Sequence, residues 1–206
     1  MSFARYAAAQ LGNPSGIAGN LAAFVWNRRN AVLNDVVFDA LNPGPTDRVL
    51  EVGFGGGYLL GRMSAIVTDG LLTGVDISPA MVRLCEKRHR SLVESGRLEL
   101  KVAQAESLPF PSGHFNKACS VNSIFYWHDA QRALSELARV LSEDGHLVLC
   151  FTHKESLERR GFAKHVALYD PEDIERMAML CGLWVTTKRA SDMHREFLCM
   201  TARKKP

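Results

Sequence analysis

A glycine-rich turn between an apolar strand and a helix limits the folds open to this chain more than any other feature. Residues 49–57 read Val-Leu-Glu-Val-Gly-Phe-Gly-Gly-Gly, and a helical pattern follows over residues 58–68. Glycine allows the backbone to take positive φ or to approach a ligand closely, and a helix N-terminus presents unpaired N–H groups. A strand, a glycine turn and a helix in this order are typical of nucleotide-binding α/β folds.

Strands and helices alternate along most of the chain. After the strand at 48–52, we predict helices over residues 58–68, 79–95, 130–141 and 171–181, and strands over 71–75, 97–102, 117–121, 145–151, 183–188 and 196–202. Alternation of this kind produces a parallel sheet with helices on both faces. Because no helix separates the last two strands, they must form a hairpin. The expected fold is therefore α/β, with a Rossmann-like, mostly parallel seven-stranded sheet that ends in an antiparallel hairpin.

Residues 1–42 have a different character and are expected to form a helical segment preceding the domain at 43–206. Their helical pattern runs from Ile17 to Leu41 and stops at Asn42-Pro43-Gly44-Pro45, since proline cannot continue a helix. The pattern has an apolar face and a polar, basic patch at residues 27–30. Two interpretations stay open: a helix packed on the sheet, or a lid over an acceptor pocket.

Composition excludes several classes of protein. Lys and Arg number 25 and Asp and Glu 22, and this net charge of +3 predicts no nucleic-acid partner. No run reaches the roughly 20 apolar residues of a membrane span, and no secretory signal is visible, so a cytoplasmic location is expected. The odd number and wide spacing of the cysteines predict reduced thiols and no metal site: Cys85, Cys119, Cys150, Cys181 and Cys199.

The glycine spacing separates two kinds of cofactor. A dinucleotide fingerprint GxGxxG needs a third glycine where this chain has Tyr58, and the pattern here is GxGxG preceded by Glu51. Asp76 ends the second strand, where a carboxylate can accept hydrogen bonds from both ribose hydroxyls. Two more polar segments follow the third and fourth strands, at Gln104-Ala105-Glu106 and Asn122-Ser123.

These motifs, in this order, resemble the class I S-adenosylmethionine-dependent methyltransferases. The resemblance is greatest to the small-molecule group that includes ubiquinone/menaquinone-biosynthesis enzymes, and it covers residues 47–151 best. It implies S-adenosylmethionine as donor, S-adenosylhomocysteine as product and a small-molecule acceptor. It also implies cofactor-binding roles for Glu51, Gly53, Phe54, Gly55 and Gly57 (methionine moiety), Asp76 (ribose), Ile77 (adenine face), Gln104, Ala105 and Glu106 (adenine edge), and Asn122 (methionine amino group).

The acceptor side is less well determined by the sequence. His128 and His153 follow the fourth and fifth strands and are candidate general bases for a hydroxyl acceptor. Phe54, Tyr58, Tyr126 and Trp127 are of the right type to line a pocket. Basic residues at positions 28, 29, 159, 160 and 164 favour an anionic or amphiphilic acceptor. The oligomeric state stays open.

Two other functions remain compatible with the sequence. An NAD(P)-linked oxidoreductase would use a similar sheet, although Tyr58 and the closing hairpin argue against it. A non-catalytic S-adenosylmethionine-binding module would share every cofactor motif.

Overall fold

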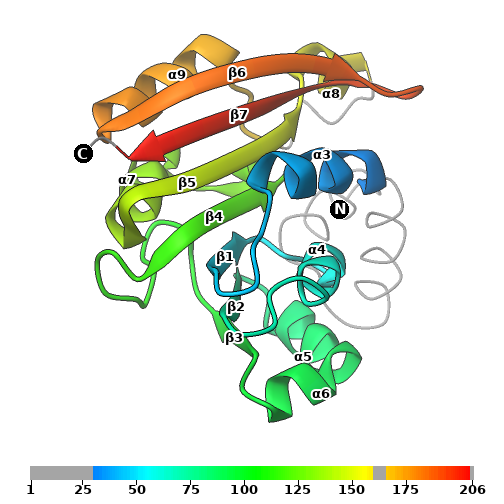
Figure 1. Cartoon of the computed structure of the whole chain (residues 1–206). Helices are drawn as coiled ribbons and strands as arrows, with labels where there is room; N and C mark the ends of the chain where they lie inside the picture. Colours follow the sequence, from blue (N-terminus) through cyan, green and yellow to red (C-terminus); the bar gives the residue numbers. More distant parts are fainter. Residues whose placement is uncertain (1–29, 160–165, 205–206) are drawn as a thin grey trace.

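The computed structural model describes residues 30–159 and 166–204 as a seven-stranded sheet flanked by helices (Figure 1). The strand order is β3-β2-β1-β4-β5-β7-β6. The first five strands in chain order are parallel, whereas β7 runs antiparallel to both β5 and β6. The strands are β1 (Arg48–Val52), β2 (Leu71–Asp76), β3 (Leu98–Val102), β4 (Phe115–Val121), β5 (Leu141–Thr152), β6 (Leu183–Ser191) and β7 (Glu196–Lys204).

Helices cover both faces of this sheet. The described helices are α3 (Ala31–Leu41), α4 (Tyr58–Met63), α5 (Pro79–Arg88), α6 (Arg90–Glu94), the 3-10 turn η1 (Ile124–Tyr126), α7 (Ala130–Val140), α8 (Lys154–Arg159) and α9 (Pro171–Leu180). Alternate residues of β1 belong to different cores: Val49 packs with α3, α4 and α5, and Leu50 packs with α7 and α9. This two-residue period is what a sheet buried on both faces requires.

The predicted fold class is confirmed, including the C-terminal hairpin, which forms one edge of the sheet opposite β3 (Figure 1). Two predicted helices are shorter than the sequence indicates. The first ends at Met63, and just beyond it the Arg97 guanidinium donates hydrogen bonds to the Ser64 and Val67 carbonyls. The second is interrupted at His89, whose ring nitrogen lies 2.9 Å from the Gly57 carbonyl oxygen. The sequence pattern also missed α8.

The described part of the N-terminal segment packs on the sheet. In α3, Leu33, Val37 and Leu41 are fully buried in the core that includes residues of β4, β5 and β7. Asn42 then adopts φ 45°, which ends the helix as the sequence predicts. The remainder of the predicted helix, residues 17–29, lies outside the described residues, so the lid interpretation stays a prediction.

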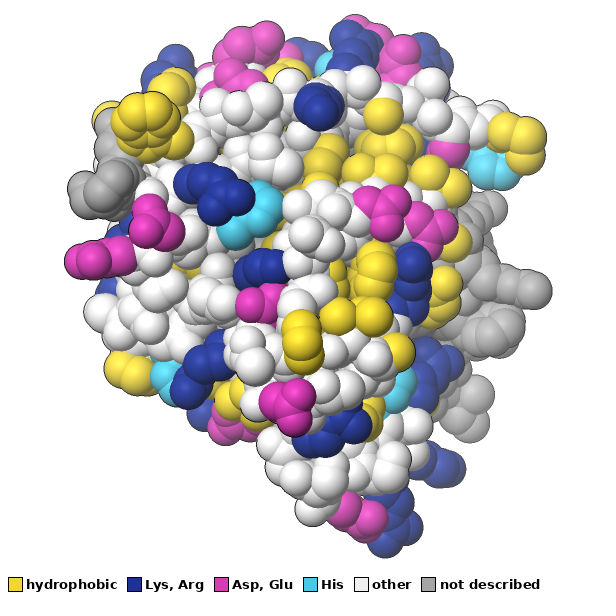
Figure 2. All heavy atoms as spheres, viewed as in Figure 1, with side chains coloured by type: hydrophobic (Ala, Val, Ile, Leu, Met, Phe, Trp, Pro, Cys, Tyr) yellow, Lys and Arg dark blue, Asp and Glu magenta, His cyan; other side chains and the backbone are white. Residues whose placement is uncertain are grey.

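Charge is distributed evenly over the face in Figure 2, where Lys and Arg side chains alternate with Asp and Glu. No helix within residues 30–159 and 166–204 is both long and apolar enough to cross a membrane. All five cysteines are free thiols.

Candidate functional site

The three glycines of the loop after β1 all have positive φ but serve different purposes. A methyl group on Gly53 would lie 2.4 Å from the Ser123 Cβ, and one on Gly57 would lie 2.3 Å from the Cys85 Sγ. Tight packing therefore requires these two glycines. Gly55, at φ 53°, has no atom of residues 30–159 or 166–204 within 4 Å of the place a Cβ would take. The loop thus presents open backbone at Gly55, where a ligand can approach closely.

Asp76, at the end of β2, holds this loop in place. Its two carboxylate oxygens accept hydrogen bonds of 2.9 Å from the Gly55 and Ser78 amides. Burial raises the pKa of Asp76, and the two backbone bonds oppose that shift. An ionised carboxylate has about four acceptor positions. Two of these positions are therefore not used by the described residues.

Glu51 lies beneath the loop and is buried. Burial, reinforced by the nearby Asp76 charge, raises the pKa of Glu51 to about 8, although a hydrogen bond from the Leu60 amide lowers it in part. The carboxylate thereby serves the first turn of α4, whose N-cap is a glycine. The other oxygen, Oε2, is buried and has no hydrogen-bond partner within the described part of the chain. An orphaned acceptor of this kind is suited to a cationic or hydrogen-bonding ligand group.

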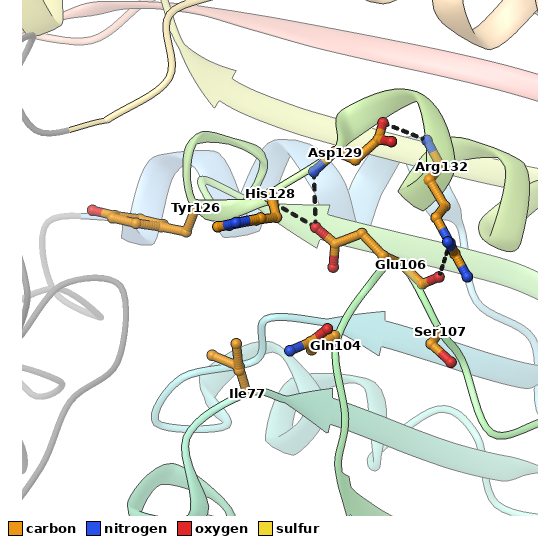
Figure 3. A pocket seen from close by; sticks show the side chains of 8 residues that line it. All are labelled: Ile77, Gln104, Glu106, Ser107, Tyr126, His128, Asp129 and Arg132. Carbon is orange, nitrogen blue, oxygen red and sulfur yellow. Dashed lines mark hydrogen bonds between the residues drawn. The ribbon is translucent and has the colours of Figure 1, made fainter.

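A pocket of about 430 Å³ adjoins the end of β2 (Figure 3). On one side lie Ile77 and Gln104, from the loops after β2 and β3; on the other lie Tyr126 and His128, from the segment after β4. Ile77 is 43% exposed, which is unusual for an isoleucine and leaves its side chain open to a flat apolar group. The remaining lining residues are Glu106, Ser107, Asp129 and Arg132.

Three of the predicted cofactor residues have side chains that are already engaged. Phe54 and Ala105 are buried in the two cores, so only their backbones can face a ligand. The Glu106 carboxylate accepts hydrogen bonds from the His128 and Asp129 amides and thus orients the segment that enters α7 (Figure 3). The family resemblance predicts that Glu106 lies at the adenine edge. Nothing in the sequence around Glu106 predicts its hydrogen bonds to the segment on the opposite side of the pocket.

Asn122 joins three elements at the carboxyl edge of the sheet. Its Oδ1 accepts hydrogen bonds from the amide and the hydroxyl of Thr152, at 2.8 and 3.1 Å, and its Nδ2 donates to the Asn30 Oδ1 at 2.9 Å. The residue adopts φ 54°, a conformation that Asn tolerates better than most residues. Asn122 thus links β4, β5 and the start of α3; its contact with a ligand stays a prediction.

The two predicted bases lie in different surroundings. His128 is exposed and shares its pocket with Ile77 and Gln104, the residues predicted for adenine. His153 is buried where β5 ends, and its backbone amide donates to the Glu196 carbonyl at 2.9 Å. Of the aromatic candidates, Tyr126 lines the pocket, whereas Trp127 is buried in the core. Both histidine roles stay predictions.

The pocket also has members that the sequence analysis missed. Arg132 donates from Nε to the Glu106 carbonyl at 3.0 Å, and Asp129 accepts from the Arg132 amide as the N-cap of α7. Ser107 follows the predicted adenine-edge segment directly. The capping residue Asp129 indicates in the sequence where α7 begins, but it does not indicate that Asp129 faces a pocket.

Comparison with known proteins identifies relatives of this chain. The family model described as "Methyltransferase domain" matches residues 50–149. The uncharacterized methyltransferase YdaC of Bacillus subtilis is 29% identical over 136 residues, which are 66% of this chain and 73% of that protein. The ubiquinone/menaquinone biosynthesis C-methyltransferase UbiE of Citrifermentans bemidjiense is 33% identical over 50% of this chain, but these residues span only 44% of that protein.

Solved structures agree on the fold. The [4+2]-cyclase SpnF is similar with a TM-score of 0.76 at 19% identity, over 87% of this chain and 82% of that one. A geranyl diphosphate methyltransferase in complex with SAM has a TM-score of 0.74 at 16% identity, over 95% of this chain and 94% of that one. At these identities the likeness concerns the fold alone.

Proposed function

We propose that this chain is a class I S-adenosylmethionine-dependent methyltransferase and that its site transfers the methyl group of that cofactor to a small-molecule acceptor. One observation carries the site assignment. At the carboxyl ends of β1 and β2, the Gly55 amide is hydrogen-bonded to the Asp76 carboxylate, and the next residue, Ile77, lines the pocket. Ligands of open α/β sheets bind at this edge.

The residues present fit the cofactor part by part. The buried Glu51 oxygen, which no described residue pairs with, suits the ammonium group of the methionine moiety, and the spare acceptor positions of Asp76 suit the ribose hydroxyls. The exposed Ile77 side chain suits the adenine face. When bound, the cofactor supplies a methyl group already activated on a sulfonium.

The protein's own contribution is then placement rather than activation. Asp76 and Gly55 fix the loop to which the cofactor binds, and Asn122 fixes the ends of β4 and β5 beside it. Holding two reactants in a reactive orientation lowers a barrier by roughly 7–11 kcal/mol. No described side chain is required to create a leaving group, so a general base is needed only if the acceptor must lose a proton.

The acceptor itself is proposed only by class. The match to UbiE covers only 44% of that protein, so its substrate cannot be assigned to this chain. An anionic or amphiphilic acceptor and a cytoplasmic location both stay predictions from the sequence. The oxidoreductase alternative is not favoured by the relatives, all of those cited being methyltransferases or sharing their fold.

Calorimetric titration tests the cofactor assignment directly. S-adenosylmethionine and S-adenosylhomocysteine are expected to bind with one molecule per chain, whereas NADH and NADPH are not. Transfer of a radiolabelled methyl group to members of a small-molecule library then separates an enzyme from a binding module. Binding of a nicotinamide dinucleotide in place of the two adenosyl compounds would overturn the proposal.

Gly55→Ala should weaken S-adenosylhomocysteine binding by at least about tenfold, or 1.4 kcal/mol, because the added methyl group enters the space proposed for the ligand. Gly96→Ala is the matched control. Gly96 also has positive φ and an open Cβ position, but it lies in the turn before β3. Both variants should lose about 1–2 kcal/mol of stability from the strained backbone. Equal affinities of the two variants for S-adenosylhomocysteine would show that the Gly55 loop is a turn without a role in binding.

A further inference from the structure

Three side chains with metal-binding atoms meet where β5 ends. His153 follows the last residue of β5, Glu155 lies in the first turn of α8, and Glu196 begins β7. One potential ligand atom from each lies within 4.8 Å of those of the other two. The backbone braces the group: the His153 amide donates to the Glu196 carbonyl, and the Glu196 amide donates to the Ser156 Oγ at 3.1 Å.

The His153 ring gives a second, independent sign of a ligand. The residue is only 5% exposed, and its Nδ1 is buried with no hydrogen-bond partner among the residues that the structure describes. Leaving a buried polar group unpaired costs about 1–3 kcal/mol, so natural proteins rarely do so without a reason. Neutral imidazole is also the commonest metal ligand among side chains.

We propose that His153, Glu155 and Glu196 bind a divalent cation. One imidazole and two carboxylates suit Mn²⁺, Fe²⁺ or Zn²⁺, and the two carboxylate charges balance that of the ion. Three protein ligands leave coordination positions free for water or for an oxygen atom of another molecule. The sequence predicts no metal site because Glu196 is separated from the other two residues by α9 and β6.

Nearby arginines set the strength of this site. The Arg189 guanidinium donates a hydrogen bond to Oε2 of Glu196, and Arg159 adds a second positive charge nearby. A carboxylate has two oxygens and about four acceptor positions, so one arginine leaves room for a metal. The positive charge nevertheless opposes a cation. Removing Arg189, which is exposed, should therefore tighten cation binding.

The place of the cluster relates it to the proposed function, on which this step rests. Thr152 immediately precedes His153 and donates its amide to the Asn122 Oδ1, beside the loop assigned to the cofactor. A cation here would lie near Asn122 at the same edge of the sheet, where it can bind a hydroxyl, carboxylate or phosphate group of an acceptor. Cation binding is measured without cofactor, so its failure is distinguishable from failure of the methyltransferase assignment.

Mn²⁺ titration of the full chain, followed by electron paramagnetic resonance, tests the site. Mn²⁺ avoids the five free thiols, which would compete for Zn²⁺. One Mn²⁺ per chain is expected, with at least tenfold weaker binding in Glu155→Gln and Glu196→Gln and tighter binding in Arg189→Gln. Glu158→Gln is the matched control, because Glu158 is an exposed carboxylate of the same helix outside the cluster.

A structural measurement completes the experiment. Mn²⁺ should broaden the NMR signals of the His153 imidazole, and the Glu155→Gln substitution, at an exposed position, should remove that effect without unfolding the protein. Absence of stoichiometric Mn²⁺ binding would overturn the proposal. So would equal losses of affinity in Glu155→Gln and Glu158→Gln, since general surface charge would then account for the binding.

Discussion

Replacing Asp76 by alanine should weaken binding of S-adenosylhomocysteine by about 10- to 150-fold. A hydrogen bond to a charged group contributes roughly 1.5–3 kcal/mol, which corresponds to this range of affinity. The carboxylate lies at the end of β2, and the described residues occupy only two of its acceptor positions. Calorimetry on the wild-type protein and the variant measures the loss, and undiminished affinity would remove Asp76 from the ribose site.

A second ligand distinguishes the contribution of Asp76 to ribose binding from its hydrogen bonds to the loop. Because Asp76 also accepts hydrogen bonds from the Gly55 and Ser78 amides, the variant loses loop order as well. The wild-type protein should bind S-adenosylhomocysteine more tightly than its 2′-deoxyribose analogue, whereas Asp76→Ala should bind the two nearly equally. If Asp76→Ala still bound S-adenosylhomocysteine more tightly than the deoxyribose analogue, the loss of affinity would come from the loop alone.

The fold could be predicted from the sequence because its determinants are local and repeated. Apolar strands of five to seven residues alternate with helical patterns, and Ser78 and Asp170 each occupy the N-cap position of a helix that begins at the following proline, as predicted. Helix ends were harder to predict because distant residues set them. The Arg97 guanidinium binds carbonyls just after α4, and His89, at which α5 stops, contacts the distant Gly57 carbonyl; no local pattern indicates either contact.

The candidate site divides along the same line. The glycine loop, Asp76 and Ile77 could be predicted from short sequence motifs, and the structure brings them together. The opposite wall of the pocket could not be predicted in this way, because Tyr126 faces Ile77 only through the position of β4 on the other side of β1 in the sheet. For the same reason the cluster of His153 and Glu196 depends on strand pairing between β5 and β7.

Glu51 should make the protein less stable as the pH rises from about 4.5 to about 8. Its pKa is raised from 4.5 in the unfolded chain to about 8 in the folded protein by burial and by the Asp76 charge. Below the unfolded value both states carry the proton, and stability is unaffected. Between the two values only the unfolded state releases it, so unfolding becomes easier with pH until the folded carboxyl also ionises. The total loss is on the order of 5 kcal/mol.

Glu51→Gln keeps the shape of the protonated side chain and cannot ionise, so it should abolish most of this slope. Urea unfolding is expected to give similar stabilities at pH 5 and a clear gain for the variant at pH 8.5, whereas Glu158→Gln, at an exposed position, should follow the wild-type curve. The same substitution should weaken S-adenosylhomocysteine binding if the orphaned Oε2 receives the methionine amino group. A variant that gains stability and loses affinity would show that the buried carboxylate is kept for the ligand. Parallel pH curves for Glu51→Gln and the wild-type protein would contradict the raised pKa.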